Sequence, residues 1–234
     1  MTEAEKGQQC QNQSGQTQRR RVSVYAIHSE TVRRMDWGVL YARLPVRMEK
    51  TDRYRFERDR LLSAGAGILL LQVLGLREES ELQCGEYGKL SAPGYPAFNL
   101  SHSGEWCVLA TGEGELGVDI ERMDAAHLRI APKVYTPAEL QWMNEHPLER
   151  FYRLWTWKES VMKATGQGMR LEPRGFEVLP FAKDEPILLN GQHWYACDGA
   201  LEDCRYSVCA PYPLKTELII YEEAKPIEIH RNDR

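Results

Sequence analysis

The sequence predicts an α+β fold, in which strands and helices are grouped along the chain rather than strictly alternating. Short segments with the two-residue alternation of strands gather at residues 97–111 and after residue 187. Longer segments with helical apolar spacing stand between these groups. No glycine-rich phosphate loop leads into a helix, which argues against a doubly wound nucleotide-binding sheet.

The first half begins with an alternating strand at residues 21–27, followed by an apolar helix at 58–76 that is interrupted by Gly65 and Gly67. Residues 97–102 and 106–111 then form a hairpin around Ser103-Gly104-Glu105. The second half repeats this plan, with a strand at 116–122 and helices that end at Thr165 before Gly166. Further strands are expected near residues 176–179, 187–189, 194–196, 206–210 and 217–221, with Asn190-Gly191 as a tight turn.

Composition fits a soluble globular protein and excludes several classes. The 234 residues can bury a core as one large domain or two small ones, and 42% of them are hydrophobic. No apolar run is long enough to span a bilayer, and a net charge of −4 does not attract nucleic acid. Six scattered cysteines without zinc spacing predict reduced thiols in the cytoplasm.

Two ends of the chain are expected to lie outside the folded part. Residues 1–21 are rich in Gln, Glu, Ser and Arg and lack the apolar core of a signal peptide, so we expect them to be disordered. The expected organisation is an N-terminal subdomain at 22–113, a C-terminal subdomain at 114–222 and a tail at 223–234.

Two carboxylates in the strand at 116–122 are the first candidate site. Asp119 and Glu121 stand two residues apart, so both side chains leave the same face of the strand. Adjacent anions repel unless a proton or a cation lies between them, and Mg²⁺ prefers such oxygen donors. The alternative is a simple solvated face.

A helix at residues 151–165 holds the second group of charged residues. Its apolar positions form one continuous stripe, with Lys158 in the middle and Glu159 at the edge. Lys163 lies one turn after Glu159, a spacing that is usually an exposed stabilising pair. Burying an unpaired ammonium costs several kcal/mol, so we expect Lys158 to reach a cleft that holds an anion.

Four segments together resemble the motifs of the 4′-phosphopantetheinyl transferases, of the longer surfactin-synthetase-activating type. They are Gly117-Val118-Asp119-Ile120-Glu121, the helix from Trp155 to Ala164 with Trp-x-x-Lys-Glu-Ser-x-x-Lys-Ala spacing, Phe98-Asn99-Leu100-Ser101-His102-Ser103 followed by Trp106, and Glu86-Tyr87-Gly88-Lys89-Leu90. The resemblance spans residues 22 to 222. It implies two pseudo-twofold-related α+β subdomains with the active site in the cleft between them.

The resemblance also implies the activity, which is transfer of the 4′-phosphopantetheine group from coenzyme A to a serine of an apo acyl or peptidyl carrier protein, with release of adenosine 3′,5′-bisphosphate. Mg²⁺ would be held by Asp119, Glu121 and Glu159, and Lys163 would neutralise the pyrophosphate. Glu159 or a metal-bound water would take the serine proton.

The implied contacts to coenzyme A come from both halves. Lys89, Ser101 and His102 would hold the nucleotide end, with Lys158 as a further candidate for the phosphates. Arg47 and Lys50, just after Pro45, match the positions that hold the 3′-phosphate, although the family often has lysine where Arg47 stands. Without the resemblance, these two residues belong to a basic run that reads as a solvated helix face.

Some alternatives stay open. Thr136-Pro137-Ala138-Glu139 is a helix start with a capping box, although the family has a glutamate near the metal at this position in some members. His102 could be a hairpin histidine only. The alternative functions are a metal-dependent phosphohydrolase or nuclease, and a non-catalytic module that binds coenzyme A or a carrier protein. We expect a monomer, because the two halves already form the cleft.

Overall fold

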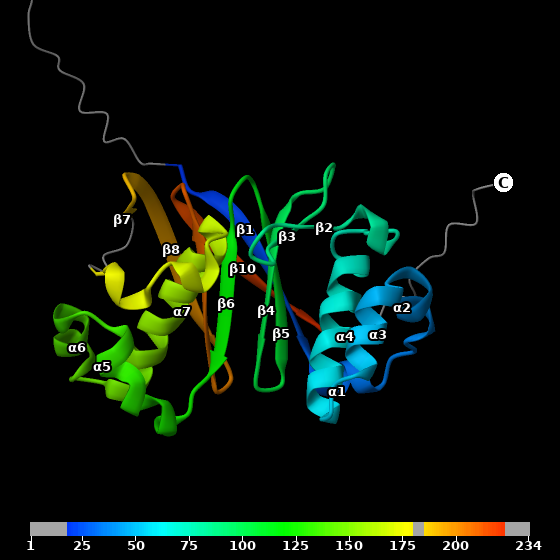
Figure 1. Cartoon of the computed structure of the whole chain (residues 1–234), viewed down its shortest axis with the longest axis horizontal. Coiled ribbons are helices and arrows are strands. Elements are labelled where there is room, and N and C mark those ends of the chain that lie inside the picture. Colours follow the sequence, from blue (N-terminus) through cyan, green and yellow to red (C-terminus); the bar gives the residue numbers. More distant parts are fainter. Residues whose placement is uncertain (1–17, 180–184, 223–234) are drawn as a thin grey trace, which may run out of the picture.

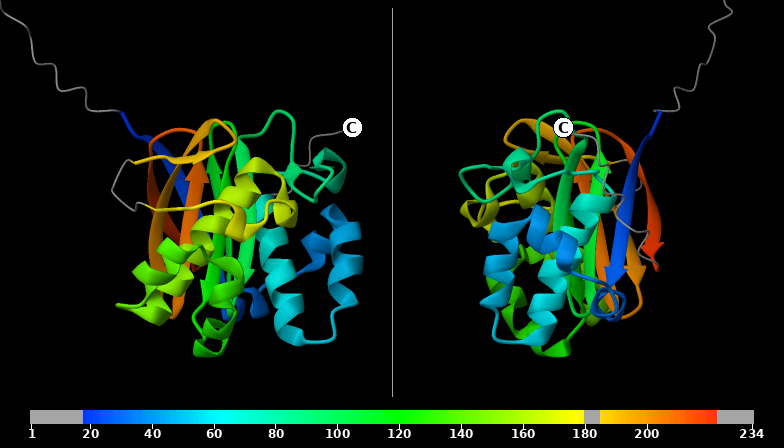
Figure 2. Two further views of the ribbon diagram at one scale, coloured as in Figure 1. Left: turned by 60° about the vertical axis from the view of Figure 1, so that its left-hand side comes forward. Right: turned by 90° about the vertical axis from the view of Figure 1, so that its right-hand side faces the viewer.

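The computed structural model describes residues 18–179 and 185–222, and two four-stranded sheets dominate it. The first sheet has the order β10-β1-β5-β4 and the second the order β6-β9-β8-β7 (Figure 1). A separate two-stranded hairpin is formed by β2 (Gln83–Cys84) and β3 (Leu90–Ser91). In the view turned by 90°, the strands lie on one side of the molecule and the helices on the other (Figure 2). The fold is therefore α+β, as predicted.

The first sheet consists of β1 (Arg20–His28), β4 (Ala97–Ser103), β5 (Trp106–Gly112) and β10 (Leu214–Tyr221). The predicted hairpin between residues 97 and 111 is confirmed, and Gly104 makes its turn with a φ of 59°. β10 pairs in parallel with β1, so the last strand of the second half completes the sheet of the first half. β1 begins at Arg20, inside the segment expected to be disordered, and residues 1–17 lie outside the described residues.

Helices cover the first sheet on one side. They are α1 (Ser29–Arg33), α2 (Gly38–Arg43), α3 (Pro45–Asp52) and α4 (Glu57–Gln72), followed by the short 3₁₀ turn η1 (Glu79–Glu81). α4 runs without a break through Gly65 and Gly67, and nearly all its residues from Leu61 to Leu71 are buried. A Cβ at Gly67 would lie 3.2 Å from Leu40 and Leu44, so the glycines allow close packing rather than breaking the helix.

The second sheet consists of β6 (Gly117–Arg122), β7 (Ile187–Leu189), β8 (Gln192–Leu201) and β9 (Cys204–Ala210). Its helices are α5 (Ala131–Val134), α6 (Pro137–Met143) and α7 (Pro147–Thr165). Three 3₁₀ turns complete this half, namely η2 (Ala125–Ile130), η3 (Gly168–Arg170) and η4 (Pro173–Gly175). α7 ends at Thr165 with Gly166 in the left-handed conformation, as the sequence predicts.

Two further predictions have different outcomes. The Asn190-Gly191 turn between β7 and β8 is confirmed, with φ angles of 50° and 75°. The strand expected near residues 176–179 is not present. There the backbone N–H of Val178 donates to the Glu139 carboxylate at 2.9 Å, so a side chain replaces the partner that a neighbouring strand would supply. The expected tail at 223–234 lies outside the described residues.

The buried apolar side chains of the described residues form three clusters. One lies between α4 and the first sheet, a second joins the two sheets, and a third lies between α7 and the second sheet. Within the described residues, no helix combines the length and the apolar character needed to cross a membrane.

Candidate functional site

The two sheets meet where β4 runs beside β6, and side chains rather than a backbone ladder join them. Alternate residues of β4 face β6, because successive side chains of a strand point to opposite faces. Their oxygens accept hydrogen bonds from alternate backbone N–H groups of β6: Asn99 from Val118 at 2.9 Å, Ser101 from Ile120 at 3.4 Å and Ser103 from Arg122 at 3.1 Å. The resemblance implies that the motif at residues 98–103 contacts the nucleotide, and it gives no indication that Asn99 and Ser103 hold the backbone of β6. The alternation of polar side chains along this strand is the signal that could have predicted that role.

The same serines hold the two carboxylates of β6. Ser101 Oγ donates to Asp119 Oδ1 at 2.9 Å, and Ser103 Oγ donates to Glu121 Oε2 at 2.7 Å. Both carboxylates thus face β4, as their spacing predicts. Asp119 is 3% exposed, and its Oδ2 atom is buried and makes no hydrogen bond within the described residues. A buried oxygen without a partner is costly, and a cation or a hydrogen-bond donor beside it would remove that cost.

α7 packs closely against β6 because residue 117 is glycine. A Cβ at Gly117 would lie 2.0 Å from the carbonyl oxygen of Ser160 and 2.4 Å from the backbone nitrogen of Ala164. No side chain fits in that space. The glycine therefore lets the α7 segment that contains Glu159 and Lys163 lie directly beside Asp119.

Lys163 bridges the two halves. Its Nζ donates to Asp119 Oδ1 at 2.7 Å and to Ser101 Oγ at 2.8 Å. The Ser101 hydroxyl donates one hydrogen bond to Asp119 and accepts one from Lys163 and one from the N–H of Ile120. All its hydrogen-bonding capacity is therefore used. Ser101 positions the carboxylate and the ammonium in this structure, and its expected direct contact to the nucleotide stays a prediction.

The other carboxylates of the cluster are hard to ionise. Burial raises the pKa of Glu159 to about 7, with a further rise from the charge of Asp119 and an opposing effect from Lys163. Burial and then the charge of Asp119 also raise the pKa of Glu121, while the Ser103 hydrogen bond and Lys163 lower it. One lysine thus does not offset three neighbouring carboxyl groups.

This arrangement fits a hard divalent cation. Among the described residues, no three Asp, Glu, His or Cys side chains already stand as a ready metal site. The donors nevertheless have the required chemistry, because the free Oδ2 of Asp119 and the raised pKa values of Glu121 and Glu159 would all be relieved by an ion such as Mg²⁺. Binding would require the side chains to converge.

A basic pocket lies on the other face of β4. We call it the Arg47 pocket; its volume is about 490 Å³, and Arg47, Lys50 and His102 are among its lining residues. The Nε atom of Arg47 is buried without a hydrogen bond, and burial lowers the pKa of its guanidinium. Partial desolvation and then the Lys163 charge lower the pKa of His102. The structure thus brings together three residues expected to contact coenzyme A, and an anion would stabilise their charges.

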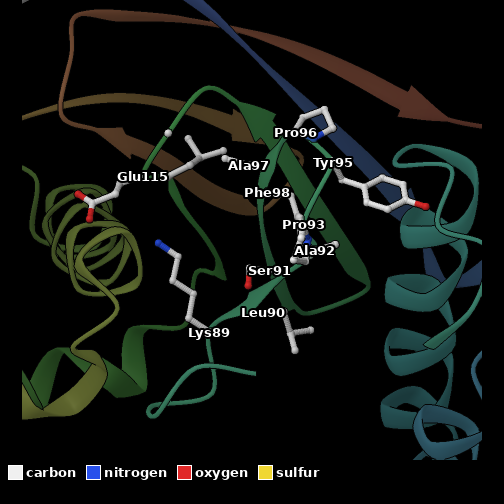
Figure 3. A pocket seen from close by; sticks show the side chains of 12 residues that line it. Lys89, Leu90, Ser91, Ala92, Pro93, Tyr95, Pro96, Ala97, Phe98 and Glu115 are labelled. Atoms are coloured by element: carbon white, nitrogen blue, oxygen red, sulfur yellow. The ribbon is translucent and has the colours of Figure 1, made fainter. Parts of the chain in front are cut away.

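Lys89, in the hairpin just before β3, reaches the end of α7. Its Nζ donates to the carbonyl oxygen of Ala164 at 2.6 Å, and burial lowers its pKa. Lys89 and Lys163 both line a pocket of about 220 Å³, which we call the Lys163 pocket. Lys89 also lines a larger, mainly apolar pocket of about 520 Å³, the Phe98 pocket, in which it lies on the same side as Glu115 (Figure 3).

The expectation for Lys158 is wrong. Its side chain is fully buried in the second half and does not reach the cleft. The ammonium pairs with Glu139 Oε1 at 2.9 Å and donates to the carbonyl oxygens of Pro173 at 2.8 Å and Phe176 at 2.5 Å. The helical pattern of α7 alone shows no partner for a lysine in its apolar stripe, but α6 supplies the carboxylate of Glu139.

Glu139 has two roles in the structure. It closes the predicted capping box of α6, since its Oε2 accepts from the N–H of Thr136 at 2.9 Å while Thr136 Oγ1 accepts from the N–H of Glu139. Its other oxygen binds Lys158 and the N–H of Val178. Every oxygen of this fully buried carboxylate therefore has a structural partner, and the cap is confirmed.

Comparison with known proteins assigns the second half most directly. Residues 115–210 match the model of the 4′-phosphopantetheinyl transferase superfamily. This range contains β6, α7 and the carboxylates described above.

Similar proteins include a 4′-phosphopantetheinyl transferase of Bacillus subtilis, which is 36% identical over 140 residues, or 55% of this chain and 62% of the relative. The transferase Sfp of Bacillus subtilis strain 168 is 30% identical over 145 residues, or 57% of this chain and 65% of Sfp. The transferase AcpT of Escherichia coli K12 is 43% identical over 95 residues, or 37% of this chain and 49% of AcpT.

The chain spans about half to two thirds of the length of these curated relatives. The family match and the similarity to the Bacillus proteins agree with the four motifs and with the carboxylate–lysine cluster between the two halves. Residues 115–210 thus carry the pattern of the 4′-phosphopantetheinyl transferase superfamily, and the similarity to the Bacillus transferases extends over a little more than half of this chain.

Proposed function

We propose that the protein transfers the 4′-phosphopantetheine group of coenzyme A to a serine hydroxyl of an apo acyl or peptidyl carrier protein. The observation that carries this proposal is the position of Lys163, which joins the β6 carboxylate to β4 at the boundary of the two halves. Anionic and cationic groups are thus held on both sides of one cleft, without a nucleophile of the protein's own. Phosphoryl transfer needs positioning and charge stabilisation, which such groups supply.

The reaction exchanges one phosphorus–oxygen bond for another. The serine oxygen of the carrier attacks the β-phosphorus of coenzyme A, and the bond from that phosphorus to the oxygen bridging the two phosphates breaks. Adenosine 3′,5′-bisphosphate leaves with the bridging oxygen. Glu159 or a water molecule at the metal would accept the serine proton.

The remaining residues bind and orient. Asp119, Glu121 and Glu159 would hold Mg²⁺, which when bound supplies positive charge to the pyrophosphate oxygens. Lys163 would leave Asp119 and meet the pyrophosphate, because its side chain is 28% exposed and lines the Lys163 pocket. Arg47, Lys50 and His102 would bind the nucleotide's 3′-phosphate end in the Arg47 pocket, and Lys89 would contact the nucleotide from the hairpin.

The test is to incubate the protein with coenzyme A, Mg²⁺ and an apo carrier protein, and to measure the mass of the carrier. We expect the carrier to gain one phosphopantetheine group and adenosine 3′,5′-bisphosphate to appear in equal amount. Hydrolysis of coenzyme A without a change in the carrier would instead indicate a phosphohydrolase. Binding of coenzyme A without either product would indicate a non-catalytic module.

We further propose that the protein acts in the cytoplasm as a monomer, with neither nucleic acid nor membrane as a partner. The five cysteines in the described part of the chain are all unpaired, which suits a reducing compartment. Both walls of the cleft come from this one chain, so a second copy is not needed to complete it.

A further inference from the structure

Within the described residues, the hairpin of β2 and β3 is not hydrogen-bonded to either large sheet and is attached to the first half mainly through Leu82 and Leu90, which pack against its apolar core. Its strands pair only with each other, through two residue pairs, and the side chains from Gln83 to Gly88 are exposed. Gly88, near its tip, has a φ of 83°, a conformation that glycine adopts readily. A hairpin of two short strands is only marginally stable by itself, so its position depends on contacts elsewhere.

The hairpin also forms a wall of all three pockets near the charged residues. Cys84 and Leu90 line the Arg47 pocket, Tyr87 to Lys89 line the Lys163 pocket, and Lys89 to Ser91 line the Phe98 pocket. The position of this one segment therefore decides the shape of the space in which we propose that coenzyme A binds.

Within the described residues, Lys89 and Tyr87 attach the hairpin to the second half of the molecule. Lys89 Nζ donates to the carbonyl oxygen of Ala164 at the end of α7. At the tip, the Arg170 guanidinium lies over the ring of Tyr87, with its carbon 4.6 Å from the ring centroid, and donates to the Tyr87 hydroxyl at 2.9 Å. Arg170 belongs to η3, which follows α7 through Gly166 and Gly168, both with positive φ.

We propose that Tyr87 and Arg170 form a latch that holds the hairpin against the Lys163 pocket, so that Lys89 stays in the lining of that pocket together with Lys163 and bound coenzyme A is released only when the latch opens. Both residues act through the hairpin and are positioning residues. Both are exposed at the surface, where such a contact is weak enough to open and close during turnover. The identity of the ligand, coenzyme A, rests on the proposed function, whereas the contact between Tyr87 and Arg170 does not.

The test compares Tyr87→Ala, Arg170→Ala and the double variant with the unchanged protein, using Arg174→Ala as the matched control. Arg174 is an exposed arginine in η4, and within the described part of the chain no hydrogen bond or ion pair joins it to the hairpin. The first readout is the dissociation rate of coenzyme A in rapid-mixing experiments with Mg²⁺. The second is amide hydrogen exchange at residues 83–91 without any ligand.

We expect each single variant to release coenzyme A roughly 5-fold faster and to raise KM with little change in kcat. The double variant should be no worse than the more affected single variant, because both changes remove the same contact. Tyr87→Phe keeps the ring beneath the guanidinium and should show an intermediate effect. Exchange in the hairpin should accelerate in both alanine variants and stay unchanged in Arg174→Ala.

Unchanged dissociation and unchanged exchange in the alanine variants would overturn the latch, as would additive losses in the double variant. These outcomes differ from a failure of the proposed function. In that case the unchanged protein would not bind coenzyme A or modify a carrier, while hydrogen exchange would still report whether Tyr87 and Arg170 hold the hairpin.

Discussion

At the scale of single residues, the environment of each charged group decides its role. Lys158 and Lys163 lie on the same helix, yet Lys158 is fully buried beside Glu139 and two carbonyl oxygens, whereas Lys163 lies at the cleft beside Asp119. The first is a structural ion pair and the second is available to a ligand. Residue type alone does not distinguish them.

Replacing Lys158 should mainly affect stability. Lys158→Met leaves the Glu139 carboxylate buried without its cation, which should lower the free energy of unfolding by about 3–5 kcal/mol. Adding Glu139→Gln should recover part of this loss, because the uncompensated charge is removed. Urea unfolding of both variants checks the prediction, and a Lys158→Met protein as stable as the original would contradict the buried pair.

Glu159 should make the stability of the metal-free protein depend on pH. Its folded-state pKa of about 7 is above its ordinary value of 4.5, so the folded protein binds the proton more tightly than the unfolded chain does. The resulting stabilisation is fully present below about pH 4.5 and is lost as pH rises through 7. Glu159→Gln should remove this part of the slope in thermal unfolding between pH 5 and 8.

Mg²⁺ provides the matching measurement for the same residue. Binding requires ionised carboxylates, so Mg²⁺ should stabilise the protein more at pH 8 than at pH 6. The stabilisation should be largely absent in Glu159→Gln, and that variant should also lose transfer activity. Equal stabilisation of both proteins by Mg²⁺ would remove Glu159 from the metal site.

At the scale of elements, the site depends on how closely two of them approach. β6 supplies carboxylates at alternate positions, and α7 supplies Glu159 and Lys163 one turn apart. Gly117 allows the two elements to touch, and the side chains of β4 hold β6 from the other side. Neither strand nor helix could place these groups alone.

Gly117→Ala should therefore damage both fold and activity. The added Cβ would lie 2.0 Å from a backbone oxygen of α7, so the helix must move, at a cost of about 1–3 kcal/mol. Gly175→Ala is the matched control, because its Cβ would meet only the side chain of Glu172 at 3.7 Å. Thermal unfolding and the carrier assay together measure the effect; a Gly117→Ala protein equal to the control would contradict the close approach.

At the scale of the whole molecule, the proposed coenzyme A site needs both halves. The Arg47 pocket belongs to the first half, the β6 carboxylates to the second, and Lys163 and Lys89 cross between them. β10 also joins the sheets, since it follows the second half in sequence and pairs with β1 of the first. A fragment that ends before β10 would leave β1 without this partner.

Separate binding and reaction regions predict separate kinetic effects. Lys50→Ala should raise KM for coenzyme A with kcat nearly unchanged, whereas Lys163→Ala should mainly lower kcat. Dephospho-coenzyme A lacks the 3′-phosphate and gives a direct check. If Lys50 or Arg47 binds that phosphate, its replacement should cost much less with the truncated substrate; equal losses with both substrates would return these residues to a solvated basic face.

The sequence alone determined the features that depend on neighbours within a few residues. The β4–β5 hairpin, the alternation of β6, the end of α7 at Gly166, the turn at Asn190-Gly191 and the Thr136 capping box follow from local backbone geometry. The common direction of Asp119 and Glu121 follows in the same way. The resemblance to the phosphopantetheinyl transferases came separately, from the four sequence motifs.

Only the tertiary structure decided which distant groups meet. It placed Glu139 beside Lys158, put Asn99, Ser101 and Ser103 against the backbone of β6, and attached β10 to the first sheet. It also replaced the strand expected near residues 176–179 with a hydrogen bond to Glu139. The physical reason is that periodicity is a property of the local chain, whereas the partner of a buried charge or an edge strand is chosen by the packing of the whole molecule.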